Sequence, residues 1–271
     1  MRREGVKVCI LRVGGTNCDE ETRRAFNDFG VKAEVVHTNK IVKTRELTKY
    51  DAVVFPGGFS YGDYVRAGAI WGKKILAKLG DQLTKFVEEE KLVLGICNGF
   101  QVLVETGLLP GFQGVNESPK AALASNTSIR YECRWIYLKH ENSGKCKFTT
   151  KIPKGKTIFM PVAHAEGRYL FSKEREKEYL SKLYDNDQLV FRYCYENGDH
   201  ANGKYPANPN GSFHDIAGIC NPEGTVFGLM PHPERAYYGW QLPDWTRRSR
   251  MLKYGDGRLI FESIFDYLMK K

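Results

Sequence analysis

A cysteine lies between two glycines near the middle of the chain, in the segment Gly95-Ile96-Cys97-Asn98-Gly99. The spacing Gly-x-Cys-x-Gly is the cysteine counterpart of the Gly-x-Ser-x-Gly nucleophile elbow, in which glycines permit a sharp turn from a strand into a helix. The unpaired N–H groups at the start of that helix favour the thiolate. The pattern predicts that Cys97 is a nucleophile, and a buried structural cysteine is the alternative.

A histidine and a carboxylate lie close together farther along the chain, in Pro231-His232-Pro233-Glu234. The two prolines hold the backbone extended around His232, which fixes the imidazole and the Glu234 carboxylate relative to each other. A nucleophile, a general base and a carboxylate that orients the base form a catalytic triad. We therefore predict that His232 is the base for Cys97 and that Glu234 orients it. A rigid turn without a catalytic role is the alternative.

A second thiol, Cys18, precedes a predicted helix whose first turn is acidic. This helix end also favours a thiolate. Cys18 lacks the flanking glycines and the preceding buried strand of Cys97, so it is the less favoured nucleophile. The side chain of Thr16 or Asn17 is predicted to cap the helix.

Short apolar runs and amphipathic segments predict the elements that position these residues. Strands are predicted at 6–13, 33–37, 52–55 and 92–94, and helices at 82–90 and 100–109. In the second half, strands are predicted at 126–138, 156–162 and 189–195, a hairpin at 216–220 and 225–230, a helix at 173–183 and a loop at 202–212. The pattern predicts an α/β fold: an open, mainly parallel sheet with an antiparallel elaboration, in a single domain over residues 1–271.

Two adjacent glycines, Gly57 and Gly58, follow the strand predicted at 52–55. In open α/β sheets, ligands bind beyond the carboxyl ends of the strands. A backbone N–H in this turn is therefore a candidate donor to an oxyanion formed at Cys97. A plain turn is the alternative.

The composition limits the classes of function. The chain has 271 residues, 42% of them hydrophobic, and no apolar run approaches the roughly 20 residues of a membrane span. Its seven cysteines include no Cys-x-x-Cys pair, and no secretory signal is recognisable, which favours a reduced, cytoplasmic protein without structural zinc. The net charge is +9, and residues 130–182 hold 13 Lys and Arg against 6 Asp and Glu. Half of these cations stand singly between apolar residues, so they are interpreted first as solvated faces. No nucleic-acid motif accompanies them, so an acidic protein surface or a phosphorylated small molecule is favoured over nucleic acid.

Together these motifs resemble the class I, triad-type glutamine amidotransferases. Gly95-Ile96-Cys97-Asn98-Gly99-Phe100-Gln101 is similar to the nucleophile motif of that family, and His232-Pro233-Glu234 to its His-x-Glu. Further motifs resemble the glutaminase subunits of phosphoribosylformylglycinamidine synthases: residues 55–63, 130–135, 164–169 and 208–212. The similarity runs through nearly the whole chain. It implies a flavodoxin-like sheet with helices on both faces.

The resemblance also implies a mechanism. Cys97 attacks the side-chain amide of glutamine, His232 takes and returns the proton, and Glu234 orients His232. The backbone N–H groups of Gly58 and Asn98 are implied as the oxyanion hole. A further residue of the motif, Gln101, is implied as a contact of the substrate.

The same resemblance implies partners. A synthetase subunit, and a small third subunit, are expected to act with this chain, which supplies ammonia from glutamine for purine biosynthesis. The ATP and Mg sites are expected on the synthetase, with no cofactor or metal in this chain, and neither nucleic acid nor a membrane is an expected partner.

Other interpretations stay open from the sequence alone. The triad also suits an amidotransferase that serves another synthase, or a hydrolase of γ-glutamyl compounds. A basic interaction module without enzymatic activity is the alternative outside enzymes. Residues 237–257 contain two tryptophans and three arginines, and we expect them to dock a partner or to form an elaborated surface loop.

Overall fold

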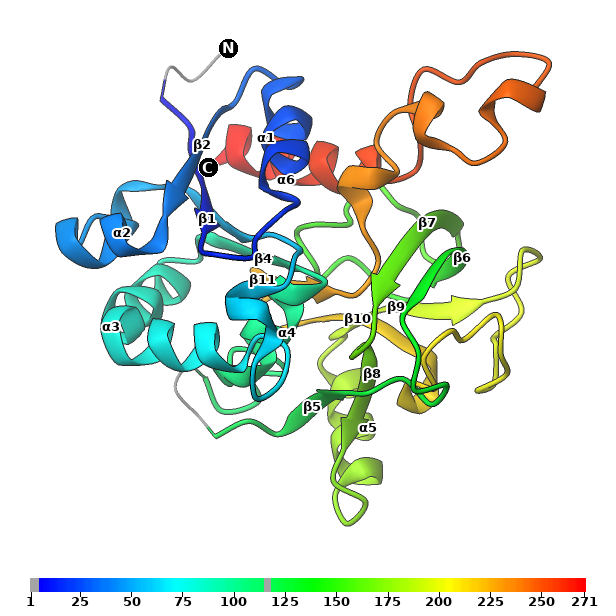
Figure 1. The fold of residues 1–271 in the computed structure, drawn as a ribbon, viewed down its shortest axis with the longest axis horizontal. Helices are drawn as coiled ribbons and strands as arrows, with labels where there is room; N and C mark the ends of the chain where they lie inside the picture. Colours follow the sequence, from blue (N-terminus) through cyan, green and yellow to red (C-terminus); the bar gives the residue numbers. More distant parts are fainter. Residues whose placement is uncertain (1–4, 115–117) are drawn as a thin grey trace.

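The computed structural model describes residues 5–114 and 118–271, and its strands form one large sheet and one small sheet (Figure 1). The strands of the large sheet are β1 (Lys7–Arg12), β2 (Lys32–His37), β3 (Ala52–Phe55), β4 (Leu92–Ile96), β6 (Glu132–His140), β7 (Thr157–His164), β9 (Leu189–Cys194), β10 (Ile216–Cys220) and β11 (Val226–Leu229). Their order across the sheet is β2-β1-β3-β4-β11-β10-β9-β6-β7. The small sheet pairs β5 (Ala121–Ala124) with β8 (Arg168–Phe171).

One half of the large sheet is parallel. Strands β2, β1, β3, β4 and β11 run side by side in the same direction. Every residue of β3, β4 and β11 is buried, which explains why these strands are apolar runs without alternation. Parallel neighbours end at the same edge of a sheet, so the segments that follow β1, β3, β4 and β11 meet there.

The other half of the sheet is antiparallel. Strand β10 forms a hairpin with β11, and β9, β6 and β7 continue the sheet by antiparallel pairing. The antiparallel elaboration predicted for the second half of the chain is therefore confirmed. It occupies four of the nine positions in the sheet, with β7 at the edge.

Helices cover both faces of the sheet (Figure 1). They are α1 (Asp19–Asn27), α2 (Thr38–Thr44), α3 (Ala69–Glu88), α4 (Asn98–Glu105), α5 (Glu176–Asp185) and α6 (Arg258–Lys270). Helices α1 and α6 pack together through the rings of Phe26 and Phe261, whose centroids are 5.2 Å apart. Helices α3 and α4 pack together as well, where Gly72 lets them approach closely. No described helix is both long and apolar enough to cross a membrane.

Several predicted boundaries were wrong. Helix α3 begins at Ala69 rather than at residue 82, and β6 begins at Glu132 rather than at residue 126. The predicted caps of α1 are wrong too, because Thr16 Oγ1 accepts from the Val13 N–H and Asn17 Oδ1 accepts from the Cys18 thiol. Helix α1 is instead preceded by Cys18, without a side-chain cap. The single domain over residues 1–271 stays a prediction, and residues 1–4 and 115–117 lie outside the described residues.

Candidate active site

Cys97 occupies a sharp turn between β4 and α4. Its backbone angles are φ 50° and ψ −104°, on the side of the Ramachandran plot that a residue with a side chain rarely adopts. The Cys97 N–H donates to the Leu229 carbonyl oxygen of β11, at 2.8 Å. A Cβ atom on Gly99 would lie 1.8 Å from the Phe55 carbonyl oxygen, so only glycine fits against β3 at this point. The strand-turn-helix elbow predicted from the two glycines is present.

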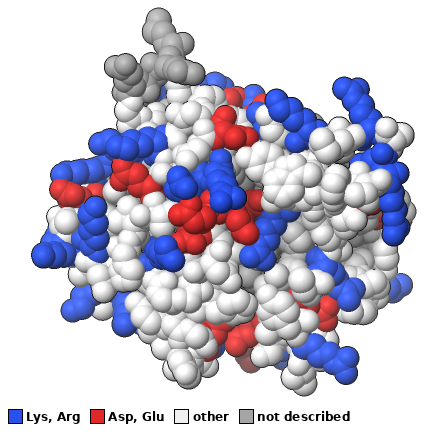
Figure 2. Space-filling model, turned by 45° about the horizontal axis from the view of Figure 1, so that its top comes forward, with Lys and Arg blue, Asp and Glu red and all other residues white. Residues whose placement is uncertain are grey.

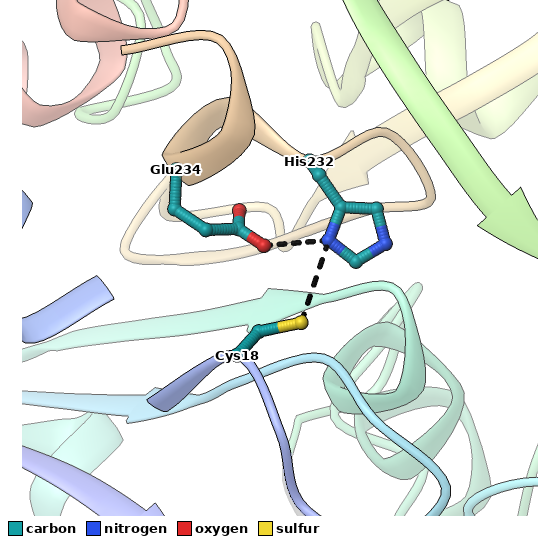
Figure 3. Close-up of side chains that lie close together, drawn as sticks. All are labelled: Cys18, His232 and Glu234. Carbon is teal, nitrogen blue, oxygen red and sulfur yellow. Dashed lines mark hydrogen bonds and ion pairs between the residues drawn. The ribbon is translucent and has the colours of Figure 1, made fainter. Parts of the chain in front are cut away.

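His232 and Glu234 follow β11, the parallel neighbour of β4. The Nδ1 atom of His232 lies 2.5 Å from Glu234 Oε1, and both side chains are buried (Figure 3). The His232 N–H donates to the Pro161 carbonyl oxygen of β7, at 2.9 Å, which fixes the backbone of the histidine. The other ring nitrogen, Nε2, has no hydrogen-bond partner among the atoms of residues 5–114 and 118–271. Glu234 therefore orients the ring and leaves Nε2 free for a reacting group.

Cys97 and His232 line one small cavity of about 30 Å³. The other residues that line it are Asn17, Cys18, Gly58, Phe59, Tyr131, Ala163 and Arg235. Burial alone would lower the pKa of His232, but the Glu234 carboxylate and the sulfur atoms of Cys97 and Cys18 outweigh burial. The pKa of His232 is therefore raised well above its ordinary value, which favours an imidazolium beside the Cys97 sulfur.

Gly57 and Gly58 lie at the end of β3, where they face the histidine ring and the cavity. The Phe59 N–H donates to the Gly15 carbonyl oxygen, and Thr16 and Gly58 face each other as an isolated antiparallel bridge. The hydrogen bonds on either side of this bridge make Thr16 and Gly58 a non-hydrogen-bonded pair, so the Gly58 N–H points away from Thr16. A Cβ atom on Gly57 would lie 2.7 Å from His232 Cε1. Close packing against His232 thus explains the glycine at position 57, and close packing against Gly15 and Thr16 explains the glycine at position 58.

Asn98 and Gln101 lie in the first turn of α4. The backbone N–H of Asn98 is among the helix-terminal groups that have no partner within a helix. The Asn98 side chain accepts from the Ser60 N–H at 3.2 Å and donates to Gln101 Oε1 at 2.9 Å. Gln101 Nε2 donates to the Glu166 carbonyl oxygen at 2.6 Å. Both side chains are buried, and their hydrogen bonds connect the elbow to neighbouring loops. The contact of Gln101 with substrate stays a prediction.

The structure brings Cys18 into the site, where the sequence pattern gave it little weight. Its Sγ lies 3.9 Å from His232 Nδ1, and the Arg235 guanidinium donates to it at 3.1 Å. Burial raises the pKa of the Cys18 thiol to about 11, so this cysteine is a neutral thiol rather than a nucleophile. The two contacts span more than 200 residues of sequence, and no local pattern could have revealed them.

The ligand atoms of Cys18, His232 and Glu234 lie within 4.8 Å of one another (Figure 3). These residue types can hold zinc. Here, however, the Glu234 carboxylate is hydrogen bonded to the ring, and the positive guanidinium of Arg235 contacts the sulfur. A second cation at this point is electrostatically disfavoured. The geometry fits a hydrogen-bonded cluster better than a metal site.

A buried polar network supports the loop that joins β7 to β8, next to the end of β7 that faces Cys97. Asn126 Oδ1 lies 3.1 Å from His164 Nδ1 and accepts from the Gly167 N–H, and Asn210 donates to the Gly167 carbonyl oxygen at 2.8 Å. Burial lowers the pKa of His164 to about 3, so its ring is neutral. Ala163, next to His164, places its carbonyl oxygen 3.5 Å from the Cys97 sulfur. The motifs at 164–169 and 208–212 thus act as a scaffold.

Comparisons with known proteins agree with this geometry. The family model described as CobB/CobQ-like glutamine amidotransferase domain matches residues 5–268. Phosphoribosylformylglycinamidine synthase subunit PurQ of Archaeoglobus fulgidus is 50% identical to this chain, and the match covers 100% of both chains. The chain belongs to the PurQ family of glutamine amidotransferases.

Other PurQ relatives are similar over nearly the full length. The PurQ subunit of Methanococcus maripaludis (strain DSM 14266) is 43% identical, and the match covers 91% of this chain and 88% of the relative. The structure of PurLQS from Thermotoga maritima contains a chain that is 34% identical, with a TM-score of 0.72, covering 97% of this chain and 99% of that chain. The predicted family and the class I glutamine amidotransferase-like α/β fold are therefore confirmed.

Proposed function

We propose that this chain is the glutaminase subunit of a phosphoribosylformylglycinamidine synthase. It hydrolyses glutamine to glutamate and ammonia, and a synthetase subunit uses the ammonia to convert formylglycinamide ribonucleotide to formylglycinamidine ribonucleotide in purine biosynthesis. One observation carries this proposal. In a chain 50% identical to a PurQ subunit over its whole length, Cys97 lies on a strained elbow and shares a cavity with His232.

The proposed reaction begins at the Cys97 sulfur. The thiolate attacks the side-chain carbonyl carbon of glutamine and forms a tetrahedral intermediate. The N–H groups of Gly58 and Asn98 stabilise its oxyanion, and each such donor contributes about 3–4 kcal/mol in comparable sites. The intermediate collapses when the imidazolium of His232 gives its proton to the amide nitrogen, which leaves as ammonia. A thioester remains on Cys97.

Hydrolysis of the thioester restores the enzyme. Neutral His232 takes a proton from a water molecule as the water attacks the thioester carbonyl, and the Cys97 sulfur departs as a thiolate beside the imidazolium. Glutamate leaves with the oxygen of that water in its new carboxyl group, which loses its proton to solvent. In both steps Glu234 holds Nδ1, so Nε2 is the nitrogen that exchanges protons with the reacting atoms.

Ammonia must reach its acceptor without entering bulk water. Free ammonia is diluted there and mostly protonated to ammonium, which is not a nucleophile. A synthetase subunit is therefore expected to bind this chain, together with a small third subunit, as the assembly named PurLQS suggests by similarity. ATP and Mg are expected on the synthetase. We place the complex in the cytoplasm, where free thiols such as Cys97 persist.

The charge distribution gives no support to a polyanion site. On the face in Figure 2, Lys and Arg side chains are spread over the surface, and a group of Asp and Glu side chains lies among them. Within residues 130–182, several cations are paired with carboxylates: Arg134 with Glu132, Lys151 with Asp266, and both Arg175 and Lys182 with Glu178. The excess of positive charge is thus a solvated and partly neutralised surface.

Reconstitution with the synthetase and the small subunit from the same source tests the proposed function. We expect formylglycinamidine ribonucleotide to form from glutamine with the native chain. With Cys97→Ala it should form from ammonium salts but not from glutamine. Loss of both activities would make Cys97 structural. Rapid glutamine hydrolysis by the isolated chain, without stimulation by the synthetase, would instead indicate a free-standing hydrolase.

A further inference from the structure

An arm formed by residues 239–253 leaves the body of the protein shortly after the candidate site, at the upper right in Figure 1. The ends of the arm are held together, because Tyr238 and Tyr254 form an isolated bridge and the Gly239 N–H donates to the Lys253 carbonyl oxygen at 3.2 Å. Between these ends the chain contains two short 3-10 turns and no strand or α-helix. The arm is thus a loop whose two ends are held together, and the part next to these ends, which includes Gln241, is called its neck.

The arm exposes large apolar side chains. Trp240 is 54% exposed, Trp245 44%, Met251 59% and Leu252 43%. Among the described residues, twelve large apolar side chains are exposed, and these four fall within this one short segment. Trp240 is held in place by stacking on Tyr238, with ring centroids 5.3 Å apart. Tryptophan, methionine and arginine are the types enriched at protein interfaces, whereas single exposed apolar residues are ordinary.

The arm also carries positive charge. Asp244 is paired with Arg248 at 3.0 Å, but Arg247 and Arg250 are exposed and form no salt bridge with the described residues. A partner surface that fits the arm therefore has apolar pockets for the indole rings and carboxylates around them. Arginine donors and aromatic anchors of this kind supply most of the binding energy in many complexes.

The neck of the arm contacts the catalytic segment. The side chain of Gln241 accepts from the Tyr237 and Tyr238 N–H groups, at 2.9 and 2.8 Å. Its Nε2 donates to the carbonyl oxygen of Glu234, at 3.1 Å. One side chain thus connects the arm directly to the residue that orients His232. A protein that binds the arm is therefore connected through Gln241 to the segment that holds the triad.

We propose that the arm is a docking site for the synthetase subunit, whose contacting face is acidic with apolar pockets. The inference rests on the proposed function and adds the surface through which the partner binds. The synthetase fits better than other occupants because ammonia transfer requires it to lie against the side of the chain that holds the active site.

A titration tests the docking site. The native chain, Trp240→Ala/Trp245→Ala and Arg247→Glu/Arg250→Glu are each added to a fixed amount of the synthetase and small subunit with glutamine, ATP and formylglycinamide ribonucleotide. For both variants we expect a half-saturating concentration at least tenfold higher than for the native chain, with the same plateau. Matched controls in or just before α5, Tyr184→Ala and Lys173→Glu/Lys177→Glu, should leave the half-saturating concentration unchanged.

The other outcomes are distinguishable. Unchanged half-saturation in both arm variants, or a lower plateau with unchanged half-saturation, would overturn the docking site. If the native chain gave no glutamine-dependent product with these subunits, the proposed function itself would fail. Binding of a single-stranded RNA at 150 mM salt that Arg247→Glu/Arg250→Glu abolishes, without an effect on the titration, would make the arm a nucleic-acid contact and would also overturn the proposal.

Discussion

The sulfur of Cys18 lies 3.9 Å from Nδ1 of His232, on the same ring nitrogen that Glu234 contacts. The catalytic histidine proposed here therefore has two neighbours on the Nδ1 side of its ring, and Nε2 points away from both (Figure 3). Arg235 contacts the same sulfur and links the group to Glu21 of α1. Cys18 is in the position of a residue that holds the base rather than one that attacks substrate.

We expect Cys18→Ala to lower kcat for glutamine by about tenfold and to leave KM nearly unchanged, because a misplaced base slows the chemical step more than it weakens binding. The thiol contact helps to raise the pKa of His232, so its loss should also move the alkaline limb of the pH profile to lower pH. Cys18→Ser, which retains a polar contact, should lie between the native chain and Cys18→Ala. Identical profiles for all three would exclude a positioning role.

Replacement of Glu234 by glutamine should have the larger effect. The carboxylate opposes the effect of burial and raises the pKa of His232, so Glu234→Gln should lower that pKa. The imidazolium form is then lost at a lower pH, and the alkaline limb of kcat/KM moves downward. We expect kcat to fall at least about 100-fold through the wrong ring tautomer and orientation. If the alkaline limb stayed at the same pH, a group other than His232 would be responsible for it.

Gly57 offers a test of the packing around the histidine ring. In Gly57→Ala the new methyl group would lie 2.7 Å from His232 Cε1 and 3.1 Å from Cys18 Sγ, so the ring must shift. A displacement of about 1 Å can cost roughly 100-fold in rate, and we expect a loss of that size in partner-stimulated glutaminase activity. Gly14→Ala is the matched control, since no atom lies within 4 Å of its added Cβ. Equal activity of both variants would contradict the packing argument.

The positive φ of Cys97 predicts a difference in stability between two inactive variants. Glycine adopts φ 50° without the steric cost of a Cβ atom, so Cys97→Gly should be more stable than Cys97→Ala by about 1 kcal/mol. Urea denaturation measures this difference. Ala217→Gly, at a buried position of β10, is the control and should be less stable than the native chain. Greater stability of Cys97→Ala would mean that the elbow stores no strain.

The sequence predicted well those features that depend on local spacing. The glycines around Cys97 predicted the elbow, and Pro231 and Pro233 predicted the stiff segment that carries His232. That these two segments meet was predicted from the logic of a catalytic triad and from the family resemblance. The parallel pairing of β4 with β11, which brings them together, was not predicted, because residues 225–230 were assigned only to a hairpin. The roles of the predicted site residues in catalysis stay predictions.

What the sequence could not predict depends on contacts between distant segments. Cys18 approaches His232 only because β1 and β11 lie in the same parallel half of the sheet. Asn126 was assigned to a strand because its neighbours are β-branched and aromatic. Its side-chain amide instead donates to the carbonyl oxygens of Arg130 and His164, which holds the turn before β6 against the end of β7. Thr16 and Asn17 have the residue types of helix caps, but nearby hydrogen bonds occupy their side chains. In each case tertiary contacts override a local preference.

The volume beside Cys97 bears on how a substrate reaches the thiol. A cavity of about 30 Å³ holds a water molecule or two and is far smaller than the side chain of glutamine. Phe59 and Tyr131, whose ring centroids lie 6.2 Å apart, both line this space. The space beside the thiol must therefore widen before the side chain of glutamine can bind there.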